Sequence, residues 1–165
     1  GTAAGVNLGP LIHSGAANTV DKLVLEAVAA GAKVLTGGKK SDLGDNFYLP
    51  TVLSDVNPSM SVAVNEIFGP VAPLIEFETD QQAIDIANDT DFGLASYIYT
   101  RDIGRVWRVS EALEYGMVGV NEGIISNEMA PFGGVKQSGM GREGSKYGIE
   151  DFLEIKYICM GGIDT

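Results

Sequence analysis

Cysteine and histidine are almost absent from this chain of 165 residues. There is one cysteine, Cys159, and one histidine, His13. A single cysteine forms no disulfide within the chain, which is typical of proteins in a reducing compartment. One residue of each type is also too few for a zinc site built from these ligands. We therefore expect a cytoplasmic protein without a bound metal.

Long hydrophobic runs and basic side chains are scarce as well. No stretch of 18 apolar residues is present to cross a membrane, and residues 1–5 lack the features of a signal peptide. The chain has 22 acidic and 11 basic residues, a formal net charge of −11 at pH 7. This charge repels the phosphates of nucleic acids and the surface of anionic membranes. We expect neither as a partner.

Hydrophobic residues are plentiful, at 45% of the chain, and their spacing predicts an alternation of helices and strands. Helices are predicted over residues 14–30, from Asp80 to Asn88 and from Asp102 onward, with Ser14, Asp80 and Asp102 as caps. Strands are predicted over residues 32–35, 48–56, 71–77, 96–99 and 117–120. In the third helix we expect the apolar side chains to face inward: Ile103, Val106, Trp107 and Leu113. The alternation favours an α/β layered fold.

Glycine recurs between Asn121 and Gly148, a segment that is long for a structureless loop, and such long loops are usually functional or mobile. Gly139, Gly141 and Gly144 match the G-x-G-x-x-G spacing of dinucleotide-binding loops. That motif should follow a buried strand and open a helix, whereas residues 135–138 are polar. We interpret the match as a glycine-rich turn.

The chain ends in an alternating apolar run, residues 152–159, which predicts a late strand. A terminal strand has few partners in its own sequence neighbourhood, so we expect it to pair with another subunit. Cys159 could act as a nucleophile, but its place in this strand indicates a packed, inert thiol. His13 could act as a general base, but its place before the first helix indicates a surface or capping residue.

Two longer blocks identify a family. Residues 65–71 read N-E-I-F-G-P-V, and residues 131–143 read P-F-G-G-V-K-Q-S-G-M-G-R-E. They resemble the E-x-F-G-P block and the P-F-G-G-x-K-x-S-G-x-G-R-E block of aldehyde dehydrogenases. Shorter matches in the same order lie at residues 9–12, 37–38 and 46–51, so the resemblance covers nearly the whole chain. Residues 117–126 look most like the succinate-semialdehyde dehydrogenases.

The resemblance implies a fold and a domain organisation. The fold is α/β, part of the three-layer catalytic domain of an aldehyde dehydrogenase, with a C-terminal oligomerisation strand. Residues 1–137 would belong to the catalytic domain, and residues 138–151 would return to a cofactor domain that is absent here. Residues 152–165 would form the oligomerisation strand and tail of a homo-oligomer.

The resemblance also implies site residues for a cofactor, NAD or NADP, and for an aldehyde. The carboxylate of Glu66 would accept hydrogen bonds from the nicotinamide ribose, and Phe68 would pack on the sugar and ring. Ser126 would bind the distal carboxylate of the substrate, and Phe132 would line the aldehyde channel. The alternatives are structural: a capped turn with a buried Phe68, a Ser126 bonded to its own backbone, and a Phe132 that packs under the glycines after it. Glu154 is either a subunit contact or a solvated charge.

The chain departs from the family pattern in its catalytic groups. The nucleophilic Cys, the general-base Glu, the oxyanion Asn and the main cofactor-binding segment lie earlier in family order, as do the substrate-binding Arg residues. Cys159, Asn121 and Glu122 are not their counterparts. We therefore expect no catalytic residue in this chain, and no dehydrogenase activity from it alone. Two alternatives remain: an enzyme for another semialdehyde, such as glutarate semialdehyde, and a non-catalytic acidic α/β assembly module.

Overall fold

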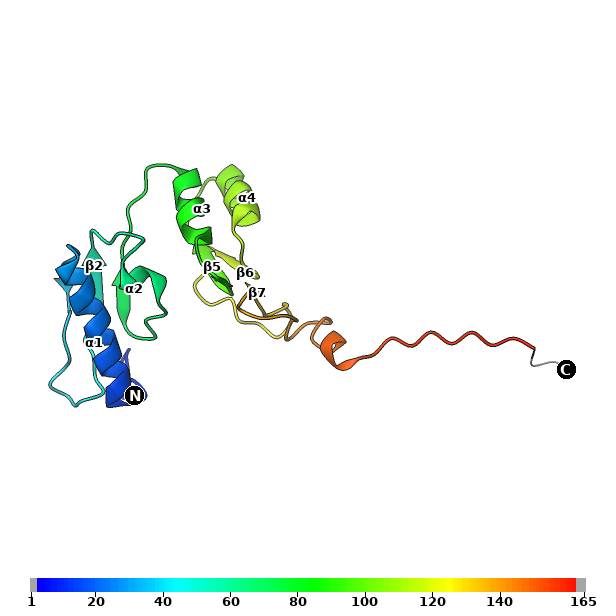
Figure 1. Ribbon diagram of the computed structural model, residues 1–165, viewed down its shortest axis with the longest axis horizontal. Coiled ribbons are helices and arrows are strands. Elements are labelled where there is room, and N and C mark those ends of the chain that lie inside the picture. The colour runs from blue at the N-terminus through cyan, green and yellow to red at the C-terminus, as the bar shows by residue number, and fades with distance from the viewer. Residues whose placement is uncertain (1–2, 163–165) are drawn as a thin grey trace. The chain divides into compact units, whose positions relative to one another are not determined.

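The computed structural model describes residues 3–162, which divide after Thr79 into two compact units (Figure 1). The first unit contains the helices α1 (Ser14–Ala29) and α2 (Ser61–Val64) and the strands β1 (Lys33–Thr36), β2 (Thr51–Ser54) and β3 (Val71–Pro73). The strands form a sheet in the order β1-β2-β3, antiparallel between β1 and β2 and parallel between β2 and β3. Pro73 lies on the edge strand, where a residue without an N–H is tolerated.

Helix α1 supplies one side of the core of this unit. Its buried residues recur at helical spacing: Ala17, Val20, Leu23, Val24 and Ala27. The helix begins at the predicted residue, but its cap is His13 and not Ser14, because the Nδ1 atom of His13 accepts a hydrogen bond of 2.9 Å from the N–H of Ala16. The helix ends before Gly31, whose φ of 110° suits a glycine.

The sheet supplies the other side of that core. Leu53 in β2 is fully buried, and Tyr48 is 4% exposed. The hydroxyl of Tyr48 donates a hydrogen bond of 3.2 Å to Oδ1 of Asp21 on α1, and burial raises the pKa of this phenol. Gly69 approaches the helix so closely that a Cβ there would lie 2.5 Å from Cγ2 of Val20. The turn before β3 therefore packs directly against α1.

The second unit contains α3 (Asp80–Asn88), β4 (Phe92–Gly93), β5 (Ala95–Ile98), α4 (Ile103–Ala112), β6 (Met117–Val120), β7 (Val135–Lys136) and a short 3₁₀ turn at Glu150–Phe152. Strands β5 and β6 pair in parallel, and β4 and β7 pair antiparallel. Helices α3 and α4 lie side by side (Figure 1). Oδ1 of Asp102 caps α4 as predicted, accepting from the N–H groups of Gly104 and Arg105 at 2.8 and 3.1 Å. These hydrogen bonds lower the pKa of the Asp102 carboxyl, and the bond from the N–H of Arg105 has the largest effect.

The prediction that the apolar side chains of α4 face inward is wrong for two of them. Ile103 is 71% exposed and Trp107 is 64% exposed, whereas Val106 and Leu113 are half-buried. The parallel sheet of this unit has two strands, β5 and β6, and so narrow a sheet covers little of a helix.

The C-terminal run is not a strand within the part of the chain that the structure describes. Residues 153–162 are extended (red in Figure 1) and pair with no other strand of residues 3–162. Cys159 is exposed, so the prediction of a packed thiol is wrong for this chain. No helix among the described residues is long and apolar enough to span a membrane.

Candidate functional site

The turn that carries Glu66 and Phe68 joins α2 to β3 in the first unit. Two backbone hydrogen bonds hold the C-terminal end of this turn: the N–H of Val71 donates to the carbonyl of Gly69, and the N–H of Thr51 donates to the carbonyl of Pro70, both at 2.8 Å. Ile67 packs against the core. Glu66 is exposed, and Phe68 is 81% exposed. The turn therefore presents a carboxylate and an aromatic ring together to solvent, and a buried Phe68 is excluded in this chain.

Phe68 also has an unusual backbone conformation. Its φ is 50°, in the left-handed region, which bulky residues seldom adopt. Such conformations persist where the surrounding structure fixes them, and they cluster at functional sites. The close contact between Gly69 and Val20 and the hydrogen bond at Pro70 fix the turn here. The strained backbone aims the ring away from the core.

Replacing Phe68 by glycine is expected to stabilise the chain. Glycine removes the left-handed strain at the cost of a more flexible unfolded chain, for a net gain of about 1 kcal/mol in the free energy of unfolding. Urea unfolding measures the change. Phe77→Gly is the matched control, because Phe77 is exposed but has no left-handed φ. A Phe68→Gly variant that loses as much stability as Phe77→Gly would contradict the expectation.

Ser126 lies in the loop that follows β6 in the second unit. The side-chain amide of Asn121 fixes the start of this loop: its Oδ1 accepts from the N–H of Thr100 at 2.9 Å, and its Nδ2 donates to the carbonyl of Thr100 at 2.8 Å. Oε1 of Glu122 accepts from the N–H groups of Gly123 and Ile124 at 2.9 and 3.1 Å. Both side chains are thus engaged within the loop. Ser126 is exposed, and its hydroxyl makes no hydrogen bond within residues 3–162.

Phe132 is half-buried and lies where the glycine-rich segment folds back on itself. Its N–H and carbonyl pair with those of Glu143 at 2.8 and 2.7 Å. Arg142 donates from Nη1 to the carbonyls of Gly134 and Gly141 at 2.8 and 2.7 Å. The ring borders an open pocket of about 240 Å³, whose lining also includes Leu94, Met140, Arg142, Glu143 and Asp151. Phe132 therefore lines a pocket together with the glycines that follow it, Gly133 and Gly134.

The glycine motif is a turn, as predicted. Gly139, Gly141 and Gly144 have φ values of 113°, 81° and 63°, and no helix begins at the motif. Glu66 and Phe68 lie in one turn of the first unit, and Ser126 and Phe132 both belong to the second unit. Their roles toward cofactor and substrate stay predictions.

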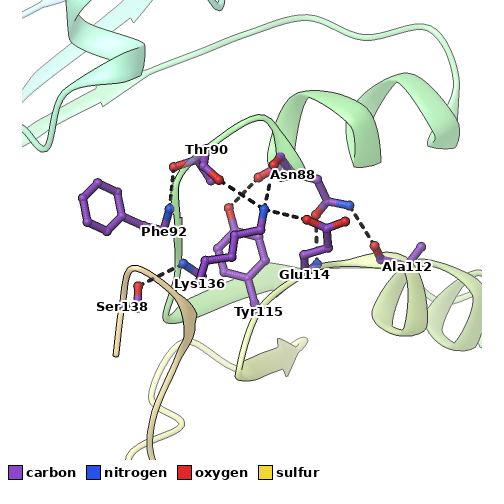
Figure 2. Close-up of polar contacts among 10 residues, drawn as sticks. Asn88, Thr90, Phe92, Ala112, Glu114, Tyr115, Lys136 and Ser138 are labelled. Atoms are coloured by element: carbon purple, nitrogen blue, oxygen red, sulfur yellow. Dashed lines mark hydrogen bonds and ion pairs between the residues drawn. The ribbon is translucent and has the colours of Figure 1, made fainter. Parts of the chain in front are cut away.

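Sequence reasoning missed a polar cluster around Lys136, which Figure 2 shows. Nζ of Lys136 donates to the carbonyls of Asn88 and Thr90 at 2.9 and 3.1 Å and pairs with Oε2 of Glu114 at 2.6 Å. The side chain of Asn88 donates to the carbonyl of Ala112 at 2.8 Å and accepts from the N–H of Glu114 at 2.9 Å. No spacing in the sequence links these positions.

Comparison with known proteins identifies the family. The model of the aldehyde dehydrogenase family matches residues 1–158. The chain is 58% identical over 164 residues to a 3-sulfolactaldehyde dehydrogenase of Pseudomonas putida, and 58% identical over 163 residues to a glutarate-semialdehyde dehydrogenase of Pseudomonas aeruginosa. Each match covers 99% of this chain and 34% of the relative, so the chain spans about a third of their length.

A solved structure agrees. The crystal structure of succinate-semialdehyde dehydrogenase from Burkholderia pseudomallei superposes with a TM-score of 0.93 at 59% identity, over 97% of this chain and 33% of that one. The predicted fold class, a partial α/β domain of this family, is confirmed. The chain belongs to the aldehyde dehydrogenase family.

Proposed function

We propose that this chain supplies part of an NAD(P)-dependent aldehyde dehydrogenase that oxidises succinate semialdehyde to the acid. The observation that carries the proposal is the similarity to enzymes named for succinate semialdehyde, glutarate semialdehyde and 3-sulfolactaldehyde. These substrates are short aldehydes with an acidic group at the far end. The shared chemistry is therefore an aldehyde carbon at one end of the pocket and an anion at the other.

Four side chains of this chain have the chemistry for these tasks. The carboxylate of Glu66, an acceptor of hydrogen bonds, would hold the hydroxyls of the nicotinamide ribose, and the Phe68 ring beside it would pack on the sugar. The free hydroxyl of Ser126 would donate to the distal carboxylate of the aldehyde, and Phe132 would form a wall of the aldehyde channel. The nicotinamide ring supplies the acceptor for the hydride. In this proposal the nucleophile and the general base come from outside this chain.

A chimaera tests the proposal. The chain replaces the corresponding third of the Burkholderia pseudomallei enzyme, which it matches at 59% identity. We expect the chimaera to oxidise succinate semialdehyde with NAD or NADP, with a higher kcat/KM than for butanal, which has no distal anion. A folded chimaera without turnover would favour the non-catalytic assembly module. Equal use of butanal and succinate semialdehyde would contradict the proposed specificity.

The same chimaera separates the substrates and tests Ser126. Glutarate semialdehyde is one methylene longer, and one methylene changes kcat/KM by roughly 10–200-fold, so the preferred chain length is measurable. Ser126→Ala should raise KM for the preferred semialdehyde about tenfold or more, because a hydrogen bond to a charged group contributes about 1.5–3 kcal/mol. The KM for butanal serves as the control and should not change.

The C-terminal segment is proposed to pair with a second copy of the protein. Its exposed side chains are largely apolar: Phe152, Leu153, Ile155, Tyr157, Ile158 and Met160. An extended chain with unpaired N–H and carbonyl groups is a ready template for another strand. Glu154 is exposed too, as a solvated charge or a subunit contact requires. The single cysteine and the charge of −11 support a cytoplasmic location without nucleic-acid or membrane partners.

Removing residues 153–165 from the chimaera is expected to dissociate its oligomer, because the strand that joins the subunits is then lost. Sedimentation velocity reports the change as a smaller sedimentation coefficient. Removing only residues 161–165 is the control and should leave the assembly intact. An unchanged coefficient after the longer deletion would show that assembly uses another surface.

A further inference from the structure

The ammonium group of Lys136 has no donor left for a ligand. A lysine ammonium has three N–H donors. In the second unit three acceptors surround it: the carbonyls of Asn88 and Thr90 and the carboxylate of Glu114 (Figure 2). The side chain is 26% exposed. Each of the three N–H donors of the Lys136 ammonium therefore has an acceptor within the chain.

The acceptors come from segments far apart in the sequence. Asn88 ends α3, and Glu114 follows the end of α4, so the ammonium sits where carbonyls at helix C-termini carry partial negative charge. The side chain of Asn88 bonds to Ala112 and to the N–H of Glu114, which ties the two helix ends to each other. The packing is close: a Cβ on Gly93 would lie 2.4 Å from the carbonyl oxygen of Glu114. Lys136 therefore fastens β7 to the C-terminal ends of α3 and α4, which are held to each other.

The segment that Lys136 fastens is the one that carries Phe132. Strand β7 pairs with Phe92 and Gly93, the N–H of Gln137 donates to the carbonyl of Asp91 at 2.9 Å, and Oγ of Ser138 accepts from the N–H of Gly93 at 2.9 Å. Lys136 itself has a left-handed φ of 55°. Its side-chain contacts hold that backbone conformation in place, and the backbone leads back to Phe132 at the pocket.

We propose that Lys136 is a positioning residue: by binding the ends of α3 and α4 it fixes residues 131–138, and so places Phe132 at the wall of the aldehyde channel. It does not bind the phosphates of the cofactor. The proposal rests on the function proposed above for the role of Phe132, whereas the fastening of residues 131–138 is a property of this chain alone.

Hydrogen exchange on the 165-residue chain tests whether Lys136 fixes residues 131–138. In Lys136→Met, the amides of Gly93, Phe132 and Gln137 should exchange at least tenfold faster, and those of β5 and β6 should keep their rates. Lys136→Arg keeps a charged donor, and its amide exchange rates should stay within threefold of those of the unaltered chain. If Lys136→Met does not fold, Lys136→Arg still tests the proposal, because larger changes in its rates would contradict it. Lys39→Met, which removes an exposed lysine, is the matched control. Equal acceleration at all amides, or none, would overturn the proposal.

A double-mutant cycle identifies the partner. Glu114→Gln should also accelerate exchange at Gln137, and the double variant with Lys136→Met should be no faster than Lys136→Met alone, because both changes break one cluster. Additive effects would show that Glu114 and Lys136 act separately.

Kinetics of the chimaera test the positioning of Phe132. Lys136→Met should raise KM for the aldehyde about tenfold and leave KM for NAD or NADP within twofold, and Lys136→Arg should restore most of the loss. A parallel rise of the cofactor KM would place the ammonium at the cofactor and overturn the proposal. If the unaltered chimaera has no turnover, the proposed function fails, and the exchange rates alone decide whether Lys136 fastens the segment.

Discussion

The 165-residue chain by itself is expected to oxidise succinate semialdehyde at least about 10⁵-fold more slowly than the chimaera, since a nucleophile and its base act as one unit. The one cysteine, Cys159, lies exposed in the C-terminal segment. Its sulfur makes no hydrogen bond within residues 3–162 that would activate it. The carboxylate of Glu122 is already bonded to the N–H groups of its own loop. These groups do not form a nucleophile–base pair.

The measurement is the formation of NADH or NADPH with the purified chain and with the chimaera under the same conditions. Cys159→Ser in the isolated chain is the control. Turnover by the isolated chain that is comparable to the chimaera, and that Cys159→Ser abolishes, would make Cys159 a nucleophile and contradict the expectation.

Leu53→Ala is expected to give the largest loss of stability, about 3–5 kcal/mol in the free energy of unfolding. Leu53 is 0% exposed and lies in the central strand, opposite Val34 on one side and Pro73 on the other. The substitution removes three buried carbons and leaves a cavity, because the sheet and α1 can move only partly to fill it. Because domains are stable by only about 5–15 kcal/mol, the variant should be partly unfolded in dilute urea.

Urea unfolding followed by circular dichroism measures this loss. Leu35→Ala is the matched control, because Leu35 lies in the neighbouring strand β1 but is 60% exposed, and it should cost less than about 1 kcal/mol. Similar losses in the two variants would show that the core is not centred on β2.

Local signals predicted the helices well. The predicted helix with Asp80 as its cap and Asn88 at its end agrees with α3 to within one residue, and the range of residues 14–30 differs from α1 by one residue. The cap at Asp102 was also found, since an N-cap depends only on neighbouring N–H groups. Periodicity does not say what covers an apolar face, however. Trp107 and Cys159 were predicted to be packed and are exposed, because the described residues offer them no cover.

The sequence likewise predicted some features of the candidate site and missed others. The resemblance singled out Glu66 and Phe68, but not the left-handed backbone at Phe68, which no rule on bulky residues predicts. Lys136 was missed because its partners lie 22 to 48 residues away in the chain and in segments that only the fold brings together. The pairing of β4 with β7 was missed for the same reason.

The extended C-terminal segment has a consequence for the newly made protein. If it pairs with a second copy as proposed, then before pairing it exposes a run of apolar residues that can also associate with unrelated chains. Glu154 and Lys156 are the charges that interrupt this run, in the manner of gatekeeper residues that slow aggregation. Replacing both by apolar residues would leave subunit recognition without that safeguard. In the proposed oligomer, the yield of assembled protein would therefore depend on whether the segment pairs with a second copy before it aggregates. A high local concentration of subunits would favour pairing.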